Sequence, residues 1–218
     1  MNLNEALQSI VKLGGSDLST AGRRAWKLVL AAVEAGEIAV DQTFRRRSNR
    51  TLLHFAAWHA SAAVMRRLLD LGALPSPRDA DGYVPMHLAA TSSYDVLEKC
   101  KMLPAADLEC RITRNGIYSP LYLITQSLLI WCLPRCMPSG MSRGVRLVQV
   151  LQWMLDQPEC PIYDYDGHGR TVADVFSCNP AYARPLAMVR AAEAARRRWT
   201  PLRAAWTKAV AAVAVAIV

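Results

Sequence analysis

The sequence contains no hydrophobic run long enough to cross a membrane. Its longest wholly apolar stretch, residues 209–218, has ten residues, whereas a membrane-spanning helix needs about 20. We therefore do not expect a membrane protein, and we expect this stretch to pack as a helix on the rest of the chain or on a partner. Contact with a membrane surface is the alternative interpretation of the same stretch.

Sequence motifs that usually carry catalysis are also missing. The chain has no Gly-x-Ser-x-Gly elbow, no glycine-rich phosphate loop and no His-Glu-x-x-His zinc motif. It has only four histidines, His54, His59, His87 and His168, and nucleophilic catalysis needs a base beside a Ser or Cys. We therefore expect a protein that is not an enzyme and that needs no cofactor.

The six cysteines lack the dense spacing of a disulfide-rich secreted protein. Cys132 and Cys136 are the one close pair, and without a second Cys or His pair they do not predict a zinc site. Residues 164–167, Asp-Tyr-Asp-Gly, begin like a calcium loop, but Val175 stands where an EF-hand needs its twelfth-position Glu. We expect no bound metal and reduced thiols in a cytoplasmic protein, including one in a cytoskeletal assembly, with a mitochondrial location as the alternative.

What the sequence does have is a basic surplus and a high apolar content. The formal net charge is +8, and much of it comes from arginine clusters at residues 45–50, 66–67 and 196–203. Such clusters can contact RNA phosphates, an acidic protein or solvent. The apolar fraction of 52%, which is rich in Ala and Leu, argues against disorder and is typical of tightly stacked helices.

A repeated motif is the most informative feature of the chain. Residues 51–57, Thr-Leu-Leu-His-Phe-Ala-Ala, recur as residues 84–90, Val-Pro-Met-His-Leu-Ala-Ala, which places His54 and His87 33 residues apart. In this period, and in the likeness of both copies to the pattern Thr-Pro-Leu-His-x-Ala, the chain resembles the ankyrin-repeat family. The resemblance implies an all-α fold, namely an α-solenoid of helix-turn-helix units between helical caps. It also implies that His54 and His87 bond to backbone across neighbouring turns.

The resemblance divides the chain into an N-terminal helical cap (1–44), an ankyrin-repeat domain (45–178) and a C-terminal helical tail (179–218). Two helices are predicted in the cap, one beginning near Leu3 and a second over residues 25–35, which Gly36 ends. Thr51 is predicted to cap the inner helix of the first repeat. Val84 occupies the same position in the second repeat, and the loss of its side-chain cap should cost about 1 kcal/mol.

Two divergent units follow. The third begins at Asn115 and carries Ser-Pro-Leu-Tyr at residues 119–122, and the last begins at Thr171. We place an insertion between these motifs at about residues 127–144, where Pro134, Pro138, Gly140 and Gly144 disfavour helix. An outer helix is expected at residues 145–155, and an amphipathic helix is expected in the tail from Leu202 to Ile217.

In ankyrin repeats the turn tips and the exposed side of the inner helices form the binding surface. The resemblance therefore implies these site residues: Arg47, Ser48, Arg50, Trp58, His59, Ala80, Asp81, Tyr83, Thr91 and Ser92. An exposed Trp beside Arg is typical of an interface hot spot, although Trp58 could instead pack against the N-terminal helices. We predict a non-catalytic protein–protein interaction module, either an adaptor or a structural subunit of a larger assembly. The alternative is a basic component of a ribonucleoprotein, such as an organellar ribosome.

Overall fold

The computed structural model describes the whole chain except residues 14–15, 18, 113–117, 132–137, 167 and 198–218. Within the described ranges the protein is all-α, as predicted, and its strand-like pairings are the two isolated bridges Phe44–Arg50 and Ile112–Tyr118. The predicted tail helix from Leu202 and the predicted start of the third unit at Asn115 lie outside the described residues.

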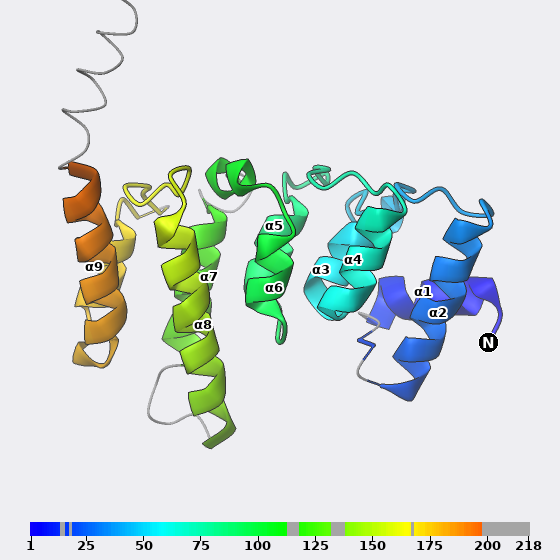
Figure 1. Cartoon of the computed structure of the whole chain (residues 1–218), viewed down its shortest axis with the longest axis horizontal. Coiled ribbons are helices and arrows are strands. Elements are labelled where there is room, and N and C mark those ends of the chain that lie inside the picture. Colours follow the sequence, from blue (N-terminus) through cyan, green and yellow to red (C-terminus); the bar gives the residue numbers. More distant parts are fainter. Residues whose placement is uncertain (14–15, 18, 113–117, 132–137, 167, 198–218) are drawn as a thin grey trace, which may run out of the picture.

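Pairs of helices stand side by side in one row, and loops along one edge connect them (Figure 1). The pairs are α1 (Leu3–Leu13) with α2 (Thr20–Glu34), α3 (Leu52–His59) with α4 (Ala62–Asp70), α5 (Pro85–Thr91) with α6 (Val96–Lys101), and α7 (Pro120–Trp131) with α8 (Pro138–Asp156). The row ends with α9 (Val172–Ser177), the 3-10 helix η3 (Pro180–Tyr182) and helical residues 183–197. Helices α3, α5 and α7 contact one another in turn as an inner layer, and α2, α4, α6 and α8 form an outer layer.

One continuous hydrophobic core runs between the two layers. Leu53, Met65 and Leu68 are fully buried where α3 meets α4, and Leu121 and Leu151 are fully buried where α7 meets α8. Many of the other buried positions are alanines, which let neighbouring helices approach closely. Each helix pair buries its apolar face against the next pair, so the stability of the row depends on stacking.

The helix ends in the first two pairs follow local sequence signals. The predicted stop at Gly36 is confirmed, because this glycine has φ +74° immediately after α2, and Gly72 ends α4 in the same way with φ +90°. These left-handed conformations are easily adopted by glycine. Thr51 occupies the N-cap position of α3, as predicted, but its side chain makes no cap hydrogen bond. Val84 precedes α5 without a side-chain cap hydrogen bond.

Helix α2 begins five residues earlier than predicted. It runs from Thr20 rather than from residue 25, because the Ser19 hydroxyl oxygen accepts a hydrogen bond from the Gly22 backbone N–H at 3.0 Å. The first turn of α2 contains Gly22, which lowers helix propensity. The N-cap therefore outweighs the poor helix propensity of this turn.

The predicted insertion is largely helical, which corrects our expectation that its prolines and glycines break the helical pattern. Helix α7 continues to Trp131, and α8 begins at Pro138, seven residues before the predicted start, so that Gly140 and Gly144 lie inside it. Pro138 occupies the first position of α8, where its missing N–H has no helical partner to lose. Both helices are longer than their counterparts α5 and α6, whereas Pro134 lies outside the described residues.

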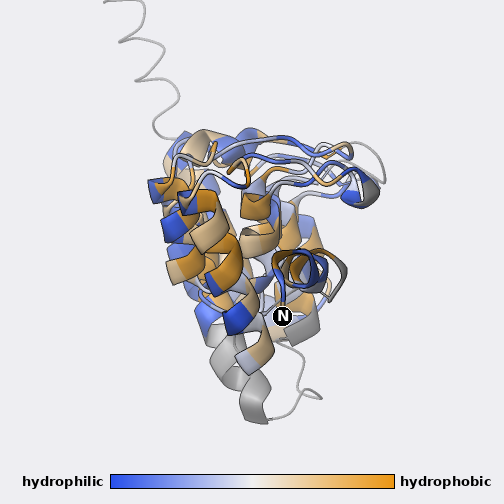
Figure 2. Cartoon of the chain, turned by 90° about the vertical axis from the view of Figure 1, so that its right-hand side faces the viewer, coloured by the Kyte–Doolittle hydropathy of each residue, from blue (hydrophilic) through white to orange (hydrophobic). Residues whose placement is uncertain are grey.

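The loops that connect the pairs share one kind of backbone hydrogen bond, in which an N–H donates to a carbonyl four or six residues later. Phe44 bonds with Arg50, Asp79 with Tyr83, Ile112 with Tyr118 and Asp166 with Arg170, in each case through a backbone N–H and carbonyl across the turn. Each turn is followed at once by the first helix of a unit: α3, α5, α7 and α9. Seen from the end of the row, the turns project together beyond the helices, with α1 beneath them (Figure 2).

Gly82 provides a test of this turn geometry. Its φ is +86°, a conformation that a β-branched residue strongly resists. We expect Gly82→Val to lower the free energy of unfolding by about 1–3 kcal/mol, measured by urea denaturation. Gly82→Asn is the matched control, because Asn tolerates positive φ, and it should cost clearly less. Equal losses in the two variants would contradict the turn assignment.

Candidate functional site

His54 joins the first unit to the second. Its Nδ1 accepts a hydrogen bond from the Thr51 backbone N–H at 3.1 Å, and its Nε2 lies 3.1 Å from the Tyr83 carbonyl oxygen in the next turn. This arrangement requires a neutral ring that carries its proton on Nε2. Burial favours that form and lowers the pKa of His54, because desolvation penalises the charged ring.

His87 repeats the arrangement one unit further along the row. Its Nδ1 accepts from the Val84 backbone N–H at 3.2 Å, and its Nε2 lies 3.0 Å from the Cys110 carbonyl oxygen. Burial lowers the pKa of His87 to about 4. In the third unit the equivalent residue is Tyr122, whose hydroxyl donates to Asp166 at 2.6 Å. The same position therefore bonds to the following turn in all three units.

Asp79 organises the second turn. Its Oδ1 accepts hydrogen bonds from the Asp81 and Tyr83 backbone N–H groups at 2.9 and 2.8 Å. Its Oδ2 accepts from Arg50 Nε at 2.9 Å, in a largely buried ion pair. Arg50 therefore connects the first turn to the second.

The Arg50 guanidinium also lies between two aromatic rings. Its central carbon is 5.4 Å from the centre of the Trp58 ring and 5.5 Å from that of Tyr83, within the range of cation–π attraction. The Trp58 ring stacks on His59 with centroids 4.3 Å apart, and Trp58 is still 38% exposed. We call Arg50, Trp58, His59 and Tyr83 the aromatic cluster. It presents an accessible indole that stacks on His59 and lies beside the Arg50 guanidinium.

Three predicted site residues in the aromatic cluster are thus less exposed than the resemblance implies for residues of a binding surface. The Arg50 side chain is only 16% exposed, so it supports the cluster from within. Tyr83 and His59 are half-buried, and desolvation lowers the pKa of His59. Trp58, which is 38% exposed, is the member of the cluster that is most accessible to a partner.

Ser92 is a correction, because it is buried and not on the exposed face of its helix. Its hydroxyl donates to the Trp58 carbonyl oxygen at 3.0 Å. The neighbouring carbonyls at the end of α3 are bonded in the same way: Ala57 accepts from Lys99 Nζ at 3.3 Å, and His59 accepts from the Tyr94 hydroxyl. Side chains of the second unit therefore complete the C-terminus of α3, which would otherwise leave buried carbonyls without donors.

Sequence reasoning missed Lys99 in this cap. Its side chain is fully buried, and its Nζ also donates to Ser92 Oγ at 2.7 Å and lies 4.5 Å from the centre of the Tyr94 ring. Desolvation lowers the pKa of Lys99 to about 8, and the charges of Asp95 and Asp17 oppose that shift. No sequence signal distinguished Lys99 from an exposed lysine, since α6 is too short to show a clear apolar face.

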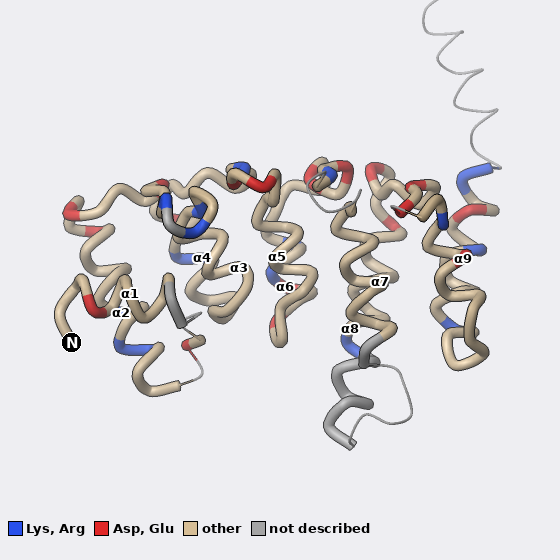
Figure 3. The backbone as a smooth tube through the Cα atoms, turned by 180° about the vertical axis from the view of Figure 1, so that it is seen from behind, with Lys and Arg blue, Asp and Glu red and all other residues tan. Residues whose placement is uncertain are grey.

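The remaining predicted site residues lie along the turn edge or on α5. Arg47 and Ala80 are exposed, Ser48 and Asp81 are half-buried, and the Ser48 carbonyl accepts from the Ala80 N–H at 2.6 Å. Thr91 is half-buried on α5 and its hydroxyl bonds to a carbonyl of its own helix. Acidic and basic residues gather along the edge that the turns form (Figure 3).

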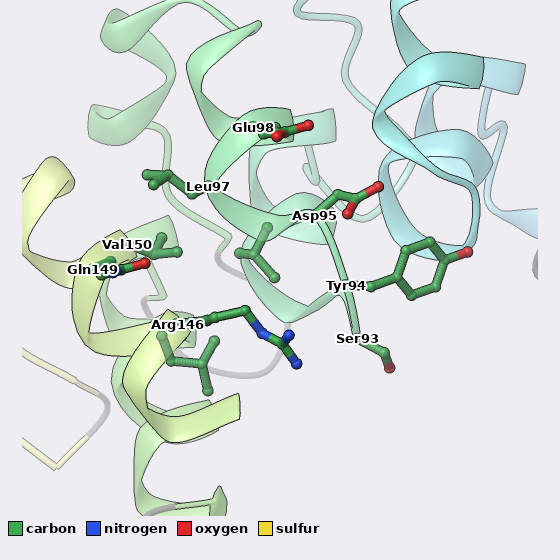
Figure 4. Close-up of a pocket in the computed structure, with 10 residues that line it drawn as sticks. Ser93, Tyr94, Asp95, Leu97, Glu98, Arg146, Gln149 and Val150 are labelled. Carbon is green, nitrogen blue, oxygen red and sulfur yellow. The ribbon is translucent and has the colours of Figure 1, made fainter. Parts of the chain in front are cut away.

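A cleft of about 250 Å³ opens between the α5–α6 connection and α8. Ser93, Tyr94, Asp95 and Glu98 line one side of it and Arg146 the other, with Val150 on the apolar wall (Figure 4). The cleft lies at the opposite end of the helices from the turns, and Tyr94, which lines it, donates to the carbonyl of His59 in the aromatic cluster.

Among the described residues, no group of three or more His, Cys, Asp or Glu side chains is placed to hold a metal ion. Cys100, Cys110, Cys160 and Cys178 are free thiols, while Cys132 and Cys136 lie outside the described residues. No helix in the described part of the chain is long and apolar enough to cross a membrane.

Comparison with known proteins assigns no family to the chain. No protein-family model matches it, and no curated protein sequence matches it.

Proposed function

We propose that the chain is an ankyrin-repeat protein that binds other proteins, as a non-catalytic adaptor or as a structural subunit of a larger assembly. The spacing of His54 and His87, their bonds to the following turns and the Asp-x-x-Gly turns at Asp79 and Asp166 support the ankyrin assignment. The buried histidines have structural partners, which favours a role without catalysis. The proposal includes no cofactor and no membrane partner.

The observation that carries the proposal is the exposed Trp58 in the aromatic cluster. A tryptophan that is held by a stacked His59 and by Arg50 loses little side-chain entropy when a partner covers it. Tryptophan is also enriched among residues that contribute most to protein interfaces. The expected partner is a protein in the cytoplasm, including the cytoskeleton, or in the mitochondrion.

The alternative function, binding RNA in a ribonucleoprotein, depends on the arginine clusters. Arg45 and Arg47 are exposed at the first turn, which favours it. However, Arg67 pairs with Glu34 at 2.7 Å, and Arg196 donates to the Gln157 carbonyl at 2.7 Å as part of the contact between helix 183–197 and α8. These two arginines therefore have partners within the protein.

Crosslinking with mass spectrometry tests the proposal. We expect specific protein crosslinks for the wild-type protein, and a loss of about 2 kcal/mol or more in the affinity for the captured partner when Trp58, Arg47 and Tyr83 are all changed to Ala. Helicity by circular dichroism should remain. Undiminished capture by the triple variant would exclude the aromatic cluster as the interface. Co-purification with RNA and a steep decrease of affinity with salt would instead support the RNA alternative.

A further inference from the structure

A second hollow lies beside the first turn. It is a groove of about 350 Å³ between α1 and residues 43–45, and it is lined by Leu7, Val11 and Phe44 together with Asn4, Gln8, Thr43 and Arg45. Its volume is at the lower end of the range of ligand pockets, about 300–1,000 Å³. It is suited to one bulky side chain of a partner.

The apolar wall of the groove is fixed in place. The Phe44 ring meets the Phe55 ring of α3 edge to face, with centroids 5.8 Å apart. Leu7 and Val11 lie one turn apart on α1, and both are half-buried. The Phe44 N–H donates to the Arg50 carbonyl at 2.9 Å, and the Arg47 N–H donates to the Phe44 carbonyl at 2.9 Å. The groove is therefore already formed without a partner, which reduces the entropy cost of binding.

The charged residue in the groove lining is basic. Of the described residues that line it, Arg45 is the only charged one, and Arg47 is exposed two residues further on in the 3-10 helix η1 (Arg45–Arg47). The nearby carboxylate of Glu5 is engaged by Asn2 and by the N-terminal amine. A partner that brings carboxylates to this rim would therefore meet arginines.

We propose that this groove binds a partner segment in which a bulky apolar side chain is flanked by acidic residues. The apolar side chain would enter between Leu7, Val11 and Phe44, and a carboxylate would pair with Arg45 at the rim. Phe44 contacts Phe55, which lies one helical turn before Trp58 on α3. This inference rests on the proposed function, because it specifies the class of protein segment that is bound.

The apolar lining favours a protein segment over RNA. A nucleic-acid backbone is usually followed by a track of several cations, with aromatic rings on which bases stack. Here one lining arginine, Arg45, stands beside a hollow whose apolar wall is formed by Leu7, Val11 and Phe44. The Phe44 ring packs edge to face against Phe55, and a leucine, methionine or phenylalanine side chain is the better fit to this wall.

The test is a selection from a random-peptide phage library on the full-length protein. The Arg45→Glu variant is used for counter-selection. Peptides that still bind this variant are discarded, so that the remaining peptides are those that need the positive charge of Arg45. We expect the enriched peptides to share an apolar residue flanked by Asp or Glu. Enrichment of basic or purely polar peptides, or no enrichment over the counter-selected pool, would overturn the inference.

The best peptide is then synthesised with a dye and titrated against variants by fluorescence anisotropy. Arg45→Glu and Asn4→Glu should each weaken binding about tenfold, because each places a negative charge at the rim. Asn4 is exposed in the first turn of α1, where an acidic residue is favourable, so that this variant should fold. Arg66→Glu is the matched control for Arg45→Glu, because it makes the same charge reversal on the exposed side of α4, and it should leave the affinity unchanged. An equal loss with Arg66→Glu would show that only net charge matters and would overturn the inference.

The same variants separate this inference from the proposed function. If the crosslinked partners persist in Asn4→Glu and Arg45→Glu but disappear in the Trp58, Arg47 and Tyr83 triple variant, the groove inference is wrong and the proposed function stands. If the wild-type protein gives no specific protein crosslinks, the proposed function is wrong. Displacement of the peptide by single-stranded RNA, with the same sensitivity to Arg45→Glu, would also overturn the inference.

Discussion

Replacing Leu68 by Ala should lower the free energy of unfolding by about 2–5 kcal/mol. Leu68 is fully buried in α4 and belongs to the core between the inner and outer layers. Its carbonyl also accepts the Ala73 N–H at 3.0 Å at the end of the helix, so the backbone there is held and cannot collapse freely into the space that the side chain leaves. The cost should therefore include a cavity contribution as well as lost burial.

Urea denaturation followed by circular dichroism measures this effect. Arg66→Ala is the control, because Arg66 is exposed on the same helix and should change stability by no more than about 0.5 kcal/mol. Because the main helix contacts join neighbouring units, the transition of Leu68→Ala should broaden as the first unit unfolds before the rest. An unchanged midpoint and slope would contradict the placement of α4 against α3.

Much of the fold could be predicted because its signals are local. The N-cap at Thr51, the stop at Gly36 and the turn that ends at Gly82 each depend on a few adjacent residues. The helix boundaries that we predicted wrongly, the starts of α2 and α8, depend on competing local effects. The Ser19 cap extends α2 through Gly22, and Pro138 begins α8 rather than interrupting it.

The candidate site was less predictable, because accessibility is set by neighbouring units. Ser92 was expected at the surface, yet it is buried, and its hydroxyl donates to the carbonyl of Trp58 in the preceding unit. Arg50 was expected at a turn tip, yet Asp79 and the rings of Trp58 and Tyr83 enclose it. These contacts join residues about 30 positions apart in the sequence, and the motif does not specify them.

The second large effect is acid destabilisation through His87. The folded ring holds its Nδ1 as an acceptor for the Val84 N–H, so protonation at Nδ1 would place two donors face to face. The pKa of His87 is about 4 in the folded protein against an ordinary value of 6.5. As the pH falls below 6.5, His87 becomes protonated in the unfolded chain, whereas in the folded chain it stays neutral until the pH approaches 4. The contribution of neutral His87 to the free energy of unfolding is therefore complete above pH 6.5, and it is lost as the pH falls toward 4.

The size of this effect follows from the shift. Each pKa unit corresponds to about 1.4 kcal/mol, so that His87 alone should cost about 3 kcal/mol across this window. His87 is fully buried, so solvent does not screen the effect. The pKa of His54 is lowered by the same cause and adds to the loss. The pKa of Asp166 is also lowered, but its contribution is lost only at more acidic pH.

Urea denaturation at pH 7 and at pH 4.5 measures the combined effect, and His87→Gln should flatten the pH dependence because an amide does not titrate in this range. Hydrogen exchange should locate the loss. Opening should increase at acidic pH in α3 and α5, where His54 and His87 hold the following turns. It should increase less in α7, where Tyr122 takes the same position and binds Asp166. Uniform opening along the row, or an unchanged pH dependence in His87→Gln, would show that the buried histidines do not determine acid stability.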